Sequence, residues 1–246
     1  MNTKGVKWIF LPPFLSKKMD KREIRLGFFT LLTIPFKKKL LVMSSLHENI
    51  ALLILAAGSS SRMGSSKQGL DLGAENLLQH TIRVALEANP NPPFVVLGAN
   101  KIFHQSLIKG YQAKIIEHDE WALGMGSSLK AGLQSILEER KDWESILVLV
   151  CDQPLLSSNH LNLLIHKSQM SEALIICSRY MNQLGVPALF RAALFPEILG
   201  IENQEGAKKI ILQHLEATEA LDFPEGALDL DTPEDYRRYL QGKPKK

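Results

Sequence analysis

From residue 50 onward the chain alternates short apolar runs with longer amphipathic stretches. The apolar runs lie at 51–56, 94–98, 113–117, 145–150 and 173–178. They predict strands, because short and mainly apolar runs of this length are typical of strands in the core of a sheet. Strand and helix patterns that follow each other in this way are typical of a mostly parallel sheet with helices on both faces.

The stretches between the runs carry apolar residues at helical spacing. The stretch 76–88 places four of them on one face: Leu77, Leu78, Ile82 and Leu86. The stretch 127–139 repeats this pattern, and 157–169 and 207–215 also predict helices. A last helix is expected to begin at Pro233, because proline is well tolerated in a first helical turn.

Composition indicates one ordinary globular domain behind a basic leader. The chain has 246 residues, of which 45% are hydrophobic and 22% charged. Residues 1–42 hold ten Lys or Arg and two acids, a net charge of +8, so the remaining residues carry −5 of the total of +3. Because the part beyond the leader is acidic overall, we expect no nucleic-acid partner.

The leader, taken as residues 1–47, does not read as a folded part. Its apolar patch at 28–36 is interrupted by Pro35 and is far shorter than the roughly 20 residues that span a bilayer. No small-residue cleavage site follows it, so it is not a usual signal peptide. Three interpretations stay open: a basic or membrane-associating arm, a disordered tail, or sequence upstream of a true start at Met43. We favour the last, with a single domain over 48–246.

The chain contains two cysteines, Cys151 and Cys177, both at or inside apolar runs. Their number and setting do not suggest a disulfide framework or a zinc site. We therefore predict a reducing, cytoplasmic location.

A Gly- and Ser-rich stretch, residues 55–67, follows the first predicted strand. Such a turn exposes backbone N–H groups with little side-chain bulk, which suits an anion such as a triphosphate, and Arg62 and Lys67 add two cations. Five residues separate Gly58 from Gly64, and Lys67 comes three later. This spacing excludes a Walker A loop, and the glycines do not form a dinucleotide fingerprint.

A second such stretch, residues 124–129, opens the helix predicted to run to residue 139. Free N–H groups and the helix dipole at a helix start attract anions. The alternative is that Gly124 and Gly126 only make a tight turn between a strand and a helix.

Carboxylates follow two strand patterns. Asp152 stands at the carboxyl end of the run 148–151, where open α/β sheets bind ligands, although an aspartate there could also cap the next turn. In the segment 228–236, alternation predicts a short strand with Asp229 and Asp231 on the same side, so that both could face one cation.

The stretch 55–67 resembles the signature L-A-A-G-x-S-x-R-M-G-x-x-K of nucleotidyltransferases that attach a nucleotide to the molybdenum cofactor, within the MobA-like NTP transferase superfamily. Similar segments of that family are G-M-x-S-S-L, which resembles 124–129, a Cys-Asp-Gln-Pro segment, which matches 151–154, and D-x-D-T-P-E-D, which matches 229–235. The resemblance covers about residues 50–240. It implies a three-layer α/β/α fold with a mostly parallel, Rossmann-like sheet of the nucleotide-diphospho-sugar transferase type.

The resemblance also implies a set of site residues. Asp152 and Asp231 would hold Mg²⁺, with Asp229 behind them, and Arg62, Lys67 and Asp152 would be catalytic. The nucleotide would be bound by residues of both glycine-rich stretches: Ala56, Ala57, Gly58, Ser59, Ser61, Arg62, Gly64, Lys67, Gly126, Ser127 and Ser128.

The implied reaction is transfer of CMP from CTP to the phosphate of the molybdopterin form of the molybdenum cofactor, with release of pyrophosphate. The guanylyl-transferring branch has Gly-Gly where this chain has Ala57-Gly58, so Ala57 favours the cytidylyl branch. Two alternatives stay open. One is a related enzyme with another triphosphate or a sugar or alcohol phosphate acceptor, and the other is a non-catalytic carrier that hands cofactor to a molybdenum hydroxylase.

Three segments that match the family pattern less closely, and one histidine, complete the prediction. The segment 184–190 resembles the family's acceptor side. The segment 203–208 departs from the family pattern, because Asn203 and Gln204 replace a Gly-Asp pair. Gly69 replaces an expected leucine and would loosen the turn around Lys67, and His118 could contact substrate.

Overall fold

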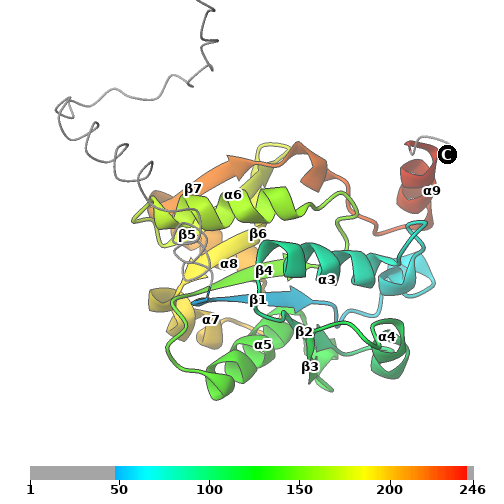
Figure 1. Cartoon of the computed structure of the whole chain (residues 1–246), viewed down its shortest axis with the longest axis horizontal. Helices are drawn as coiled ribbons and strands as arrows, with labels where there is room; N and C mark the ends of the chain where they lie inside the picture. Colours follow the sequence, from blue (N-terminus) through cyan, green and yellow to red (C-terminus); the bar gives the residue numbers. More distant parts are fainter. Residues whose placement is uncertain (1–47, 243–246) are drawn as a thin grey trace, which may run out of the picture. The chain divides into compact units, whose positions relative to one another are not determined.

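The computed structural model describes residues 48–242 (Figure 1). The leader 1–47 and residues 243–246 lie outside the described residues, so the three interpretations of the leader and the division at residue 48 stay predictions. Within 48–242 no helix is both long enough and apolar enough to cross a membrane.

Seven strands form one sheet in the order β3-β2-β1-β4-β6-β5-β7. Their bounds are Ile50–Leu55 for β1, Phe94–Leu97 for β2, Lys114–Glu117 for β3, Ser145–Val150 for β4, Ile175–Tyr180 for β5, Gln183–Arg191 for β6 and Thr218–Asp222 for β7. β6 runs antiparallel to both of its neighbours, and the other pairs are parallel. The mostly parallel sheet predicted from the pattern is confirmed.

Seven α-helices accompany the strands within 48–242. Their bounds are Leu77–Ala88 for α3, Lys101–Leu107 for α4, Met125–Glu139 for α5, Ser158–Gln169 for α6, Phe195–Gly200 for α7, Ala207–Gln213 for α8 and Pro233–Gly242 for α9. The predicted helices 76–88, 127–139, 157–169 and 207–215 correspond to α3, α5, α6 and α8, with ends shifted by one or two residues. The last helix begins at Pro233 as predicted.

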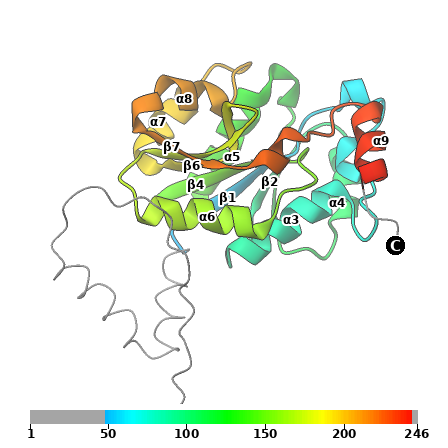
Figure 2. The same cartoon turned by 90° about the horizontal axis from the view of Figure 1, so that it is seen from above.

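Alternate residues of β1 belong to two separate cores. Ile50, Leu52 and Ile54 pack with α3 and α6, whereas Ala51, Leu53 and Leu55 pack with α5, α7 and α8. Figure 2 shows the sheet between these two helix layers. Because successive side chains of a strand point to opposite faces, a wholly buried strand must be apolar throughout, as β1 is. The expected three-layer α/β/α fold is confirmed.

The order of the sheet reverses beside β1. The chain passes from β1 to β2 and β3 on one side and then returns to β4 on the other side of β1. Open α/β sheets bind ligands where the strand order reverses, at the carboxyl ends of the strands. In Figure 1 the β1 arrow points toward α9, so the carboxyl end of β1 lies on that side.

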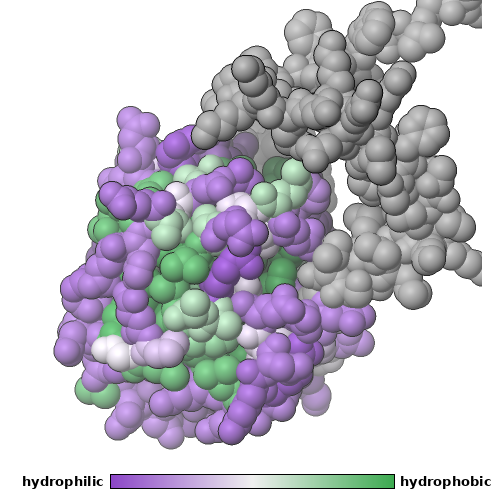
Figure 3. Space-filling view, turned by 90° about the vertical axis from the view of Figure 1, so that its left-hand side faces the viewer, coloured by the Kyte–Doolittle hydropathy of each residue, from purple (hydrophilic) through white to green (hydrophobic). Residues whose placement is uncertain are grey.

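Figure 3 shows the left-hand face of Figure 1, where hydrophobic residues are surrounded by hydrophilic ones.

Candidate functional site

The carboxyl ends of β1 and β4 bring the signature loop, residues 56–69, close to Asp152. β1 and β4 are paired from Ile50 and Ser145 to Leu55 and Val150, so both strands end at the same level. The signature loop continues β1, and Asp152 follows β4 by two residues. Two segments that lie far apart in the sequence therefore meet at the point where the strand order reverses.

The signature loop is irregular and leaves donors free. Ser60 and Gly64 adopt left-handed conformations with φ of 55° and 72°. Among residues 48–242, the backbone N–H groups of Gly58 and Ser59 have no hydrogen-bond acceptor. A Cβ placed on Gly58 would meet no atom within 4 Å, so the chain is open there. Free N–H groups in an open turn form a surface that suits an anion.

The two cations of the signature loop contact the predicted metal-ligand carboxylates. Lys67 Nζ lies 3.0 Å from Asp152 Oδ2 and 3.1 Å from Asp231 Oδ1, and Arg62 lies 2.7 Å from Asp231 Oδ2. Burial lowers the pKa of Lys67, but Asp152 and then Asp231 outweigh that effect, so the pKa is raised above its usual value. Lys67 therefore stays a cation. The structure brings these four predicted residues together from three separate segments.

Asp229 lies beside this cluster without the predicted strand. Residues 228–231 form no strand, and Leu230 instead donates one backbone hydrogen bond to the Asp152 carbonyl. The short strand predicted there is wrong, because this segment pairs once with the loop after β4 and not with a strand edge. Burial, and then Asp152 and Asp231, raise the pKa of Asp229 to about 6.

A cavity of about 290 Å³ extends from the signature loop toward the start of α5. Six of the predicted nucleotide-binding residues line it: Ala56, Ala57, Gly58, Ser59, Lys67 and Ser128. Asp152, Trp121 and Met125 also line it. The other five predicted residues do not: Ser61, Arg62, Gly64, Gly126 and Ser127. We refer to this space as the first cavity.

The glycine-rich start of α5, residues 124–128, packs against the segment 202–206. Gly126 N–H donates to the Asn203 carbonyl, and the Ser127 hydroxyl donates to the Gly124 carbonyl. A Cβ on Gly126 would lie 2.2 Å from the Glu202 carbonyl oxygen. The Gly126 N–H is therefore not a free donor, because it already has an acceptor, and the Ser127 hydroxyl also has one. Nucleotide binding by these two residues stays a prediction. The alternative of a tight turn fits Gly126 better, and Ser128 alone of the three faces the first cavity.

A second cavity of about 200 Å³ lies on the far side of Asp152. Its lining includes Tyr180, Gly185, Val186, Lys208 and Asp229, together with Asp152, which also lines the first cavity. A Cβ at Gly185 would lie 2.4 Å from the Tyr180 hydroxyl oxygen, so a side chain there would require the tyrosine to shift. Two residues of the predicted acceptor segment 184–190 thus line a cavity that adjoins the candidate nucleotide site.

Sequence analysis missed two buried glutamines and a tyrosine. Gln68 and Gln153 are 1% and 2% exposed. The Gln153 amide donates to the Val186 and Gly226 carbonyls, which joins β6 to the turn before residue 228. Tyr180 lines the second cavity, and burial, then Asp229 and Asp152, raise its pKa to about 12. Only their position in the sequence could have indicated that the two glutamines belong to the site, since each directly follows a predicted site residue.

The structure shows the contacts of three residues for which weaker expectations were stated. Gly69 does not loosen Lys67, which is held by two carboxylates; a Cβ at Gly69 would come within 3.1 Å of the Phe103 ring, so glycine allows that approach. His118 contacts the Ser127 hydroxyl at 3.0 Å. Glu205, the acidic residue next to the Asn203-Gln204 pair that departs from the family pattern, forms an ion pair with Lys209.

The carboxylates near Lys67 fit a hard divalent cation. Asp152 Oδ1 is buried and has no hydrogen-bond partner among residues 48–242, so this oxygen is free to accept a ligand. Within the same residues no group of three or more His, Cys, Asp or Glu side chains stands ready to hold a metal ion. Mg²⁺ is usually held by one or two carboxylates together with substrate phosphates, so two aspartates suffice.

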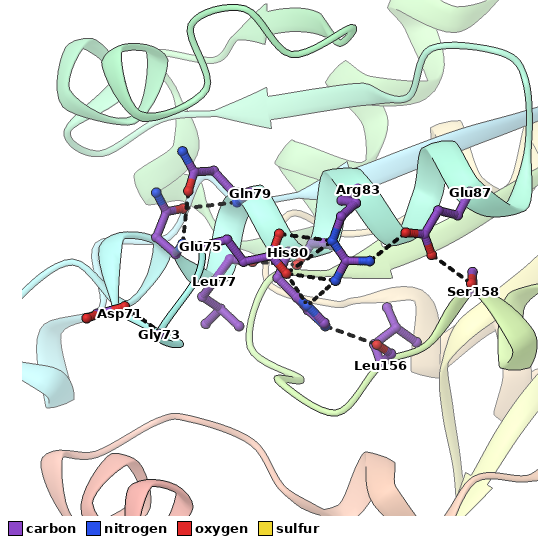
Figure 4. Close-up of polar contacts among 12 residues, drawn as sticks. Asp71, Gly73, Glu75, Leu77, Gln79, His80, Arg83, Glu87, Leu156 and Ser158 are labelled. Carbon is purple, nitrogen blue, oxygen red and sulfur yellow. Dashed lines mark hydrogen bonds and ion pairs between the residues drawn. The ribbon is translucent and has the colours of Figure 1, made fainter. Parts of the chain in front are cut away.

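Polar contacts along α3 support the loop that follows Asp152 (Figure 4). His80 contacts the Leu156 carbonyl at 3.0 Å, and Glu87 accepts a hydrogen bond from Ser158. Arg83 binds both Glu75 and Glu87, and its hydrogen bonds lower the pKa of each carboxyl. This network fixes the end of the loop after β4 against the helix that begins behind the signature loop.

Known proteins resemble this chain in sequence and in fold. Purine catabolism protein PucB of Bacillus subtilis is 30% identical over 195 residues, which cover 75% of this chain and 92% of that protein. The crystal structure of the Mycobacterium tuberculosis rv0371c homolog from Mycobacterium sp. strain JC1 superimposes with a TM-score of 0.69 at 27% identity, over 78% and 96% of the two chains.

The structure of Rv0371C of Mycobacterium tuberculosis in complex with manganese has a TM-score of 0.63 at 24% identity, over 79% of this chain and 99% of that one. Residues 52–218 match the MobA-like NTP transferase domain, and this range includes the signature loop, Asp152 and most of the sheet. The chain therefore belongs to the MobA-like NTP transferase family and is a nucleotidyltransferase.

Proposed function

We propose that the protein transfers CMP from CTP, bound in the first cavity, to the phosphate of a molybdopterin-type cofactor, bound in the second. One observation carries this proposal: Asp152 lines both cavities, and its carboxylate contacts Lys67 of the signature loop. A transfer between two substrates needs both reacting groups at one place. Asp152 marks the boundary where a triphosphate and an acceptor would meet.

In the proposed reaction an oxygen of the acceptor phosphate attacks the α-phosphorus of the triphosphate. A new P–O bond joins the nucleotide to the acceptor, and the bond to the pyrophosphate oxygen breaks. The acceptor phosphate is already an anion at neutral pH, so no general base is required. Pyrophosphate leaves with the negative charge.

The chain's own residues have distinct parts in this scheme. The free N–H groups of Gly58 and Ser59 would bind phosphate oxygens, since both residues line the first cavity. Lys67 and Arg62 would neutralise the charge that develops on pyrophosphate. Both cations contact carboxylates here, so a bound triphosphate would compete with Asp231 for them.

Asp152 and Asp231 would hold the divalent ion. When bound, Mg²⁺ would polarise phosphoryl oxygens and stabilise negative charge. The buried, unpartnered Asp152 Oδ1 supports this assignment. The manganese in the related Rv0371C structure was observed in that protein and extends to this chain only as part of the proposal.

The choice of CTP rests on Ala57, which is buried and lines the first cavity. Incubation of the full chain with Mg²⁺, molybdopterin cofactor and each of CTP, GTP, ATP and UTP tests it through pyrophosphate release. Release with CTP alone is expected. Release with another nucleotide would support the same type of reaction but would place the protein in another nucleotide branch of the family.

The choice of acceptor is tested separately. Pyrophosphate release with a sugar or alcohol phosphate, but not with molybdopterin, would replace the acceptor. Binding of the cofactor without turnover of any triphosphate would favour a carrier. The contacts among Arg62, Lys67, Asp152 and Asp231 speak against a carrier, because such a protein does not need cations and carboxylates gathered between two cavities.

A further inference from the structure

The Gln68 side chain is buried beneath the signature loop and uses its whole hydrogen-bonding capacity there. Its amide nitrogen donates to the Ala56 carbonyl at 3.0 Å and to the Gly58 carbonyl at 3.1 Å. Its amide oxygen accepts from the Ser60 hydroxyl at 3.2 Å and the Ser66 hydroxyl at 2.9 Å. A primary amide offers two donors and one oxygen with two lone pairs, and each is used.

These contacts fix the direction of two peptide planes. In a trans peptide the carbonyl and the following N–H point in opposite directions. With the Ala56 and Gly58 carbonyls directed at Gln68, the N–H groups of Ala57 and Ser59 must point away from it. Ala57 and Ser59 both line the first cavity. The Gln68 amide thus sets how the loop presents its donors.

The amide oxygen of Gln68 is linked to the backbone of Lys67 through the Ser60 hydroxyl. The Ser60 hydroxyl donates to Gln68 and accepts from the Lys67 backbone N–H at 3.1 Å. Ser60 has a left-handed φ of 55°, a conformation that L-residues adopt only when the surroundings hold them. Gln68 therefore stabilises the strained residue that anchors the backbone of Lys67.

A buried histidine connects this network to α4. His104 Nε2 lies 2.6 Å from the Ser66 hydroxyl oxygen. Because that hydroxyl donates to Gln68, the histidine nitrogen must be the donor, which assigns the proton to Nε2. Burial lowers the pKa of His104, so the ring is neutral at physiological pH. The loop is thus held from the protein interior by groups that do not themselves carry charge.

We propose that Gln68 is the positioning residue of the nucleotide site: it arranges the N–H groups of the signature loop and the backbone of Lys67 for a triphosphate. This inference rests on the proposed binding of a triphosphate in the first cavity. It assigns to Gln68 no contact with the reacting atoms. Its loss should weaken triphosphate binding more than it weakens the fold.

The test compares two variants of Gln68 with a matched glutamine elsewhere. Gln68→Met removes all four hydrogen bonds, whereas Gln68→Glu keeps the shape and replaces two donors by an oxygen that repels the carbonyls. Gln79→Met is the control, because the Gln79 side chain also forms part-buried hydrogen bonds to the backbone, of Asn76 and Leu107, but lies outside both cavities. Thermal melting of each variant checks that the substituted protein is folded.

Calorimetric titration of the full chain with Mg²⁺ and each of the four nucleoside triphosphates, without an acceptor, gives the dissociation constants. For the triphosphate that the wild type binds tightest, we expect both Gln68 variants to bind about 10- to 100-fold more weakly. Gln79→Met should melt lower and bind as the wild type does.

Wild-type affinity in both Gln68 variants, with a lowered melting temperature, would overturn the inference and leave Gln68 as a core residue. A wild-type protein that binds none of the four triphosphates would instead overturn the proposed function, and this inference with it. The two failures are therefore distinguished by the wild-type titration.

Discussion

Two Gly- and Ser-rich stretches follow strands at the same end of the sheet, yet they differ in what their backbone donors do. The signature loop leaves the N–H groups of Gly58 and Ser59 free at the first cavity. In the second stretch, which includes the first turn of α5, the Gly126 N–H donates to the Asn203 carbonyl and the Ser127 hydroxyl donates to the Gly124 carbonyl. Glycine leaves space for a ligand in the first stretch and allows close packing of the backbone in the second.

The surroundings of the two glycines show why sequence alone did not separate them. A Cβ on Gly58 would meet nothing within 4 Å, whereas a Cβ on Gly126 would lie 2.2 Å from a backbone oxygen. The oxygen belongs to a segment more than 70 residues further along the chain. Local composition therefore identifies a turn, and only tertiary contacts decide whether that turn remains available to a ligand.

The largest effect should come from the carboxylate that faces the signature loop. Asp152→Asn keeps the size but removes the charge that contacts Lys67 and that we assign to the metal. We expect turnover to fall about 1,000-fold or more, since electrostatic groups at a reaction centre have effects of this order. Pyrophosphate release measures it. Asp142→Asn, at an exposed ion pair with Arg140, is the control and should retain activity.

Loss of the loop lysine should have the next largest effect. Lys67→Met should lower kcat/KM for the triphosphate about 100-fold, because a partly buried cation between two carboxylates is removed. Lys130→Met makes the same change beside the turn before α5, where Lys130 donates to Asn203. Steady-state kinetics should show little change there, and equal losses in both variants would contradict the contrast between the loops.

Alanine substitutions of the two glycines test the contrast in stability. Gly126→Ala forces a methyl group against backbone oxygens and should reduce the free energy of unfolding by about 1–3 kcal/mol. Gly58→Ala should leave it nearly unchanged. Chemical denaturation measures both, and a destabilised Gly58→Ala with an unaffected Gly126→Ala would reverse our assignment of the two turns.

The smallest effect concerns Asp229, whose pKa of about 6 in the folded protein exceeds the usual value of 3.8. A carboxyl with a raised pKa binds protons more tightly when folded, so its contribution to stability is lost as pH rises from about 4 to about 6. Because the Asp229 side chain is only partly buried and solvent screens its interactions, we expect less than about 1 kcal/mol. Asp229→Asn should remove this part of the pH dependence in denaturation curves at pH 4.5 and 7.5, and an unchanged dependence would contradict it.

Much of the fold was predictable because β1 and β4 are buried on both faces and therefore apolar, apart from Ser145 at the start of β4. β6 and β7 were not predicted. β6 contains Gly185 and Pro187, which weaken a strand pattern, and β7 is only partly buried and carries three charged or hydroxyl side chains among its five residues. Helices α4 and α7 were also missed, since seven and six residues give little periodicity to detect.

The candidate site was predictable where residue type and position agree. Asp152 stands just beyond β4, and Lys67 lies in the loop that continues β1; the structure brings them together. Gln68 could not be assigned in advance, because its partners become apparent only when the loop folds over it. The segment 228–231 was read as a strand because alternation predicts side-chain direction and says nothing about whether a partner strand is present.

The central claim is that a nucleotide passes between the two cavities that Asp152 adjoins. The most direct measurement supplies CTP labelled with ³²P at the α-phosphate, molybdopterin cofactor and Mg²⁺, and follows the label in the wild type and in Asp152→Asn. The account predicts that the label joins the cofactor in proportion to pyrophosphate released, and that the variant transfers almost none. Label recovered only as free CMP, or transfer undiminished in Asp152→Asn, would contradict it.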